Sequence, residues 1–186
     1  MANVIKLRKG LDINLKGIAA KELVSVKKPG IYSLVPDDFT GVKPKVVVKE
    51  GENVLAGGPL FVDKNHPEVK FVSPVSGVVT SVERGERRKV LNIIVKADEN
   101  QQYVEFGKMN LAELNAEQVK EALMNAGLFA FFRQRPFDVV PDPTDAPQAI
   151  FVSAFDSAPL APDFELALKG EETNFAILCV SARKRK

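Results

Sequence analysis

The sequence predicts a mixed α+β fold in which an all-β unit precedes the beginning of an α/β domain. Two observations support this class. Short runs of β-branched residues, bounded by glycine, proline or charged residues, occupy residues 46–95. One well-marked helix and an apolar run of strand length follow them. Because the two patterns are separated along the chain, we expect separate β and α/β parts.

Strands are predicted at residues 46–48, 60–62, 69–72, 77–82 and 90–95. Residues 48–52 are echoed by residues 82–86, and each copy places a glycine, Gly51 or Gly85, where a tight turn requires a positive φ. Neither unit can bury an apolar face alone. We therefore expect the two units, related by a pseudo-dyad, to close on each other as a small flattened barrel.

A polar run at residues 97–102 predicts a linker between domains. A helix should follow, with Asn115 as N-cap, Gln118 completing a capping box, and Gly127 and Leu128 ending it in a Schellman motif. Its apolar face is expected to consist of Val119, Ala122, Leu123 and Ala126.

Four prolines in residues 136–147 predict a loop, and the apolar run 149–154 predicts a strand that is covered on both faces. The single cysteine, Cys179, lies in another apolar run and is expected to be buried.

Composition excludes several functions. The chain has 186 residues, 45% hydrophobic and 27% charged, with a formal charge of only +2, so we expect no nucleic-acid partner. It contains no run of about 18 apolar residues, so we expect no direct membrane span. The one histidine, His66, has no second histidine or cysteine nearby, and glycine-rich phosphate loops are absent. We therefore expect no metal site, cofactor site or catalytic residues.

The most unusual local chemistry is at residues 128–137, where four phenylalanines alternate with two arginines. Phenylalanine rings can stack on a planar ring and guanidinium groups can donate to carbonyl oxygens, so this composition could receive a quinone headgroup. In the alternative interpretation, the aromatic rings are core and the arginines interact with the helix end. The candidate quinone contacts are Phe131, Phe132, Arg133, Arg135 and Phe137.

Residues 48–60 and 73–79 resemble the lipoyl and biotinyl carrier fold, a barrel-sandwich hybrid. In carriers, a lysine at the tip of the intervening hairpin takes the cofactor, and Lys64 falls near that place. Residues 65–68, however, lengthen that segment and include a proline. Lys64 is therefore either a modified lysine or an exposed loop lysine.

The opening at residues 5–17, the carrier-like module, and residues 135–141 and 149–161 together resemble the NqrA subunits of the sodium-translocating NADH:quinone reductases. The resemblance extends from about residue 4 to residue 175. It implies an N-terminal extension (1–40) packing on the β module, a barrel-sandwich hybrid (41–97), and an incomplete α/β domain (98–186). The last is similar to the flavin-binding subunit of respiratory NADH dehydrogenase, but residues 129–136 replace its glycine-rich flavin loop.

That family implies a complex that transfers electrons from NADH to ubiquinone or menaquinone and exports sodium, using flavins and an iron-sulfur centre. This chain would be a peripheral, cofactor-free subunit on the cytoplasmic side of the bacterial inner membrane, contacting integral membrane subunits and a quinone. Alternatives are a free-standing carrier protein and a structural adaptor without a small ligand. Family members are longer and residues 181–186 are basic, so we expect a fragment or truncated reading frame.

Overall fold

The computed structural model describes residue 16 and residues 20–107, 113–153, 156, 158 and 161–176. Packing divides the chain into two units, one comprising residues 27–149 with 181–186, and the other residues 1–26 with 150–180. Most of the opening block at residues 5–17, Cys179 and the basic run 181–186 lie outside the described residues.

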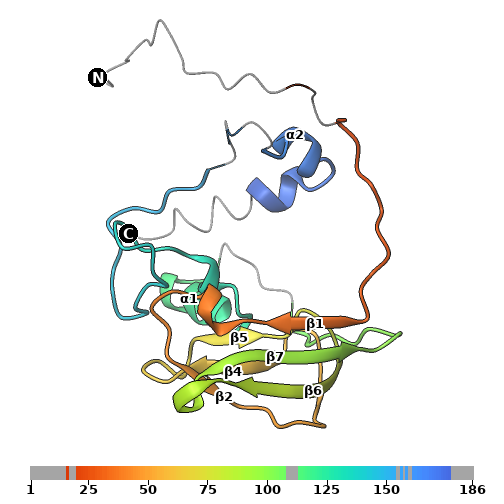
Figure 1. Cartoon of the computed structure of the whole chain (residues 1–186). Coiled ribbons are helices and arrows are strands. Elements are labelled where there is room, and N and C mark those ends of the chain that lie inside the picture. Colours follow the sequence, from red (N-terminus) through yellow and green to blue (C-terminus); the bar gives the residue numbers. More distant parts are fainter. Residues whose placement is uncertain are drawn as a thin grey trace, which may run out of the picture. The chain divides into compact units, whose positions relative to one another are not determined.

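Two antiparallel sheets form the β module of the first unit (Figure 1). One sheet has the order β1-β7-β6-β3 and the other has the order β2-β4-β5. The predicted strands are confirmed, with ends that shift by a few residues, whereas β1 and β3 were not predicted. The strands are β1 (Ile31–Leu34), β2 (Pro44–Val46), β3 (Asn53–Val54), β4 (Pro59–Asp63), β5 (Lys70–Val72), β6 (Gly77–Arg84) and β7 (Val90–Ala97).

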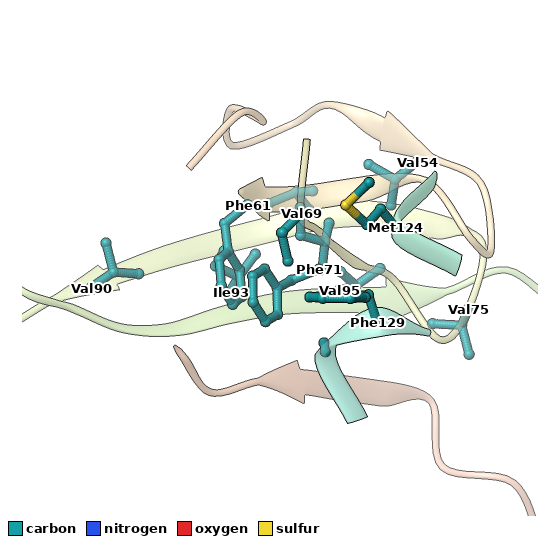
Figure 2. Packing of buried hydrophobic residues seen from close by; sticks show 13 residues of the cluster. Val54, Phe61, Val69, Phe71, Val75, Val90, Ile93, Val95, Met124 and Phe129 are labelled. Atoms are coloured by element: carbon teal, nitrogen blue, oxygen red, sulfur yellow. The ribbon is translucent and has the colours of Figure 1, made fainter. Parts of the chain in front are cut away.

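The core lies between the two sheets. Phe61 on β4 and Phe71 on β5 stack with ring centroids 4.4 Å apart, and both rings are fully buried. Figure 2 shows them beside Ile93 of the other sheet. The antiparallel register places Phe61 opposite Phe71, so pairing of the two strands and stacking of the two rings support each other.

One of the two predicted turn glycines has a different conformation. Gly51 has φ +83°, as expected, and its N–H donates to the Val79 carbonyl at 2.7 Å. The prediction for Gly85 was wrong, because this residue is extended with φ −92°. The positive φ angles of that hairpin fall instead on Arg87 (54°) and Arg88 (62°), in the short 3-10 helix η2 (Glu86–Arg88).

Strand β1 lies within residues 1–40, the range assigned from the sequence to an N-terminal extension. It pairs with β7 over four positions, from Ile31 opposite Lys96 to Leu34 opposite Ile93. These residues therefore form part of the four-stranded sheet, and the 3-10 helix η1 (Pro36–Asp38) follows them. The local signal for this strand is weak, because four residues are too few to establish a period.

The polar run predicted as a linker is attached to the β module along its second half. The Gln101 side chain accepts from the Ser76 amide at 2.8 Å, and the Gln102 amide donates to the Ser76 hydroxyl at 2.9 Å. Backbone bonds from Ala56 to Gln102 and from Val104 to Ala56 continue the attachment. The expectation of a free linker was wrong because the polar side chains bond the backbone of the module.

Helix α1 (Ala116–Asn125) begins and ends as predicted. Asn115 and Gln118 form a reciprocal capping box with bonds of 2.8 and 3.0 Å. At the other end, the Leu128 amide donates to the Leu123 carbonyl and the Gly127 amide to the Met124 carbonyl, which is the Schellman pattern. The buried residue of α1 is Met124, which the predicted apolar face omitted.

Helix α1 belongs to the same unit as the sheets. Met124, together with Phe129 and Ala130 from the 3-10 helix η3 (Phe129–Phe131), enters the core cluster of the β module (Figure 2). The Lys70 ammonium donates to the Asn125 side chain at 2.7 Å. Residues that the sequence assigned to a later domain therefore complete the core of the β module.

The predicted buried strand at residues 149–154 is wrong for its described part. Residues 149–153 are not in a strand, and Phe151 is 95% exposed. A strand forms only where a neighbouring strand pairs with its backbone, and no described strand pairs with this segment. In the second unit, helix α2 (Phe164–Ala167) is capped by Asp163, whose carboxylate also pairs with Lys21 at 2.6 Å.

The end of helix α1 yields a stability prediction. Gly127 has φ +72°, and an added Cβ would lie 2.6 Å from Cγ2 of Val72. Gly127→Ala should lower the free energy of unfolding by about 2 to 4 kcal/mol, since a positive φ and overpacking each add a cost. Urea denaturation followed by circular dichroism measures the change.

A matched control separates the two costs. Gly51 has φ +83°, but nothing lies within 4 Å of an added Cβ, so Gly51→Ala should cost only about 1 kcal/mol. Equal losses in the two variants would contradict the close packing of Gly127 on Val72.

Candidate functional site

An apolar cavity of about 190 Å³ lies where η3 and the end of α1 meet the β module. Its lining residues come from β1, from the turn after η1, from β5 and the residues after it, and from the helical segment 127–131. They are Leu34, Phe39, Phe71, Val72, Pro74, Gly127, Ala130 and Phe131. All of these side chains are apolar, so the cavity suits a hydrophobic ligand without charge.

Aromatic edges form one wall of the cavity. The Phe39 ring meets Phe71 edge-on, with centroids 4.7 Å apart, and meets Phe131 at 6.4 Å. Phe71 is fixed from behind by its stacking on Phe61. Phe131 is 72% exposed, so it is the aromatic residue of this wall that solvent reaches most. The arrangement offers ring contacts to a planar ligand on a rigid support.

The close approach of helix and sheet shapes the same cavity. Because Gly127 has no side chain, the chain can turn directly above Val72, and Ala130 then packs into the core with 2% exposure. Larger side chains at these two positions would fill the space. The small residues are therefore a local reason for the cavity.

The structure separates the five predicted quinone contacts. Phe131 lines the cavity, whereas Phe132 packs beside the core with its ring 6.0 Å from Phe129. Arg133 donates from Nη2 to the Asp38 carbonyl at 3.1 Å. This bond holds the guanidinium close to the turn that carries Phe39.

Arg135 and Phe137 belong to a tight hairpin and do not line the cavity. The Gln134 amide donates to the Val139 carbonyl at 2.8 Å, and the Asp138 amide donates to the Gln134 carbonyl at 2.9 Å. Arg135 lies 3.6 Å from the Asp138 carboxylate, and Phe137 is 74% exposed. The composition of residues 128–137 therefore identified one cavity residue and one neighbour, and did not resolve the rest.

Sequence reasoning missed most of the cavity wall. Leu34, Phe39, Phe71 and Pro74 precede the predicted segment by more than fifty positions, and no spacing links them to it. Only the strand pairings and the contact with η3 bring them together. The local signal was the run of phenylalanines after a helix with a glycine end.

Lys64 lies immediately after β4, in the connection to β5, and is exposed. In the same connection, the His66 imidazole lies 3.5 Å from Glu68 and 3.2 Å from Asp142. The pKa of the Asp142 carboxyl is lowered, chiefly by hydrogen bonds from the Thr144 hydroxyl and amide and to a smaller extent by His66. These contacts join two surface loops.

In the part of the chain that the structure describes, no three His, Cys, Asp or Glu side chains gather as metal ligands would. Within the same residues, no helix has both the length and the apolar character needed to cross a bilayer.

Comparison with known families assigns two consecutive domains. Residues 5–98 match the NqrA N-terminal barrel-sandwich hybrid domain, and residues 114–182 match the NqrA second alpha/beta domain. The two matches follow each other along the chain.

Several relatives share a substantial part of the sequence, and all three described here are NqrA subunits of Na⁺-translocating NADH-quinone reductases. The relative from Actinobacillus pleuropneumoniae is 37% identical over 174 residues, covering 92% of this chain and 39% of the relative. The relative from Pseudomonas aeruginosa is 36% identical over 168 residues (89% and 38%), and that from Serratia proteamaculans is 38% identical over 185 residues (97% and 41%). The chain thus spans about two fifths of the length of these relatives.

Proposed function

Because the chain belongs to the NqrA family of Na⁺-translocating NADH-quinone reductase subunits, we propose that it works as a peripheral component of such a reductase. The complex would transfer electrons from NADH to a quinone and couple this transfer to sodium export. The observation that carries the proposal is the ordered pair of family domains over residues 5–98 and 114–182. The chain would lie on the cytoplasmic side of the membrane and contact integral membrane subunits.

The share of this chain would be to provide a docking body and a contact for the quinone ring. An apolar cavity of about 150 Å³ is sufficient to bind benzene. The cavity beside Phe39 and Phe131 measures about 190 Å³ and therefore suits one six-membered ring. This size favours the single ring of a ubiquinone over the fused rings of a menaquinone.

Arg133 would supply polar contact to that ring. Its guanidinium has five N–H donors, and one of them bonds the Asp38 carbonyl, adjacent in sequence to Phe39. The remaining donors could bind a quinone oxygen at the edge of the cavity. Flavins and the iron-sulfur centre would then belong to other parts of the reductase, and this chain would bind no prosthetic group of its own.

Membership in the complex is tested by affinity purification. The tagged chain, expressed in cells that contain the other reductase subunits, should retain those subunits from detergent-solubilised membranes, as identified by mass spectrometry. A tagged unrelated lipoyl-type domain serves as the control. Recovery of the chain without any membrane subunit would contradict the proposal.

The quinone contact is tested by comparing two exposed phenylalanines. Phe131 and Phe137 are similarly exposed, at 72% and 74%, but only Phe131 lines the cavity. Phe131→Ala should weaken binding of a tail-less ubiquinone by about three- to tenfold, since one aromatic contact is lost. Phe137→Ala should leave binding unchanged, with saturation-transfer NMR as the measurement.

Two outcomes would overturn the quinone contact. Equal losses in the two variants would show that the cavity is not the binding site. Absence of binding to the unaltered chain would favour the structural adaptor without a small ligand, while leaving membership in the complex to the purification test.

The carrier alternative depends on Lys64, which is exposed between β4 and β5. We expect the chain from its native cells to have the mass of the unmodified 20.4 kDa polypeptide. A lipoyl or biotinyl increment, removed by Lys64→Arg, would instead support a free-standing carrier. Intact-mass spectrometry distinguishes the two results.

A further inference from the structure

A second hollow, of about 500 Å³, lies between β2 and the hairpin that joins β6 to β7. We call it the basic hollow. It shares no lining residue with the apolar cavity, and five of its eight lining residues are cationic. They are Pro44, Lys45 and Val46 of β2, Lys64 after β4, and Arg84, Arg88, Lys89 and Val90 of the hairpin.

Most of these positive charges lack a carboxylate partner. Lys89 pairs with Asp37 at 2.5 Å. Arg84 donates only to a backbone oxygen, that of Arg88, at 3.4 Å. Among the described residues, no carboxylate lies within ion-pair distance of Lys45, Lys64, Arg84 or Arg88. Like charges gathered in a concave site repel one another, and a bound anion relieves that repulsion.

The hairpin backbone holds arginines where a turn normally has glycine or asparagine. Arg87 and Arg88 adopt φ values of 54° and 62°, and the neighbouring Gly85, which could adopt such an angle without cost, is extended. An unfavourable backbone conformation at a non-glycine residue suggests a functional requirement. Here it places a cation, Arg88, at the rim of the hollow.

Strand β2 contributes a free edge to the hollow. It is the outer strand of its sheet and pairs with β4 alone. Backbone bonds join Val47 to Leu60 and Lys64 to Lys43, so by the alternation of an antiparallel ladder the N–H and C=O of Val46 point away from β4. An extended segment laid along β2 could bond to Val46.

We propose that the basic hollow binds an extended acidic segment of a partner polypeptide. The segment would lie along β2, with main-chain bonds to Val46 and its carboxylates on Lys45, Lys64, Arg84 and Arg88. Val46 and Val90 would contact its alternate apolar side chains. This inference does not depend on the reductase assignment.

Other anions fit the hollow less well. A phosphate site normally uses converging backbone amides of a glycine-rich loop or a helix N-terminus, and the lining residues belong to strands, a hairpin and a strand end. A membrane surface is contacted by protruding cations beside exposed apolar side chains, whereas these cations line a concavity. A side-chain-bearing chain with carboxylates matches both the charge and the free strand edge.

The test is a titration of the whole chain with a fluorescein-labelled peptide of alternating glutamate and valine, followed by anisotropy. The double variant Lys45→Glu, Arg88→Glu should bind at least about tenfold more weakly, since two attractions become repulsions. The control Lys27→Glu, Lys28→Glu changes the net charge equally at exposed lysines outside the hollow and should change affinity by less than about twofold.

Further arms exclude the other anions and loss of folding. Tripolyphosphate and anionic lipid vesicles should displace the peptide only at far higher concentration than a second acidic peptide does. Equal weakening in the two double variants, no binding to the unaltered chain, or more efficient displacement by tripolyphosphate or vesicles would each overturn the proposal. All substituted side chains are exposed, so thermal unfolding of both variants should match that of the parent.

Discussion

The stacking of Phe61 on Phe71 is the contact on which the rest of the molecule depends. It lies where β4 and β5 are paired, so it links the register of one sheet to the core shared with the other sheet. The same Phe71 ring then supports Phe39, which in turn contacts Phe131. Loss of this stack would therefore disturb the core and the cavity wall together.

The helical segment is joined to that core by geometry as much as by apolar area. The Schellman end of α1 turns the chain at Gly127 directly over Val72, and Ala130 follows into the core. Only a residue without a side chain permits both the positive φ and this approach. The apolar cavity is thus a product of a helix stop signal that meets a strand, and its proposed use as a ring site is a consequence of that meeting.

The β module offers two chemically different surfaces. The apolar cavity is rigid and lined by rings and small residues, which suits a flat uncharged ligand. The basic hollow is lined by long flexible cations around a free strand edge, which suits a charged polypeptide. A peripheral component of a complex needs partners as well as substrate contacts, and the two surfaces share no lining residue, so one could be occupied without blocking the other.

The sequence by itself determined the local features. Asn115, Gln118 and Gly127 predicted both ends of α1, and β-branched runs predicted five strands, because caps and periodicity act over a few residues. Tertiary structure alone decided the rest: the burial of Met124, the attachment of Gln101 and Gln102 to Ser76, and the exposure of Phe151. These depend on which distant segments meet, as do the cavity of Phe39 and Phe131 and the gathering of Lys45 with Arg88, and no spacing along the chain encodes such meetings.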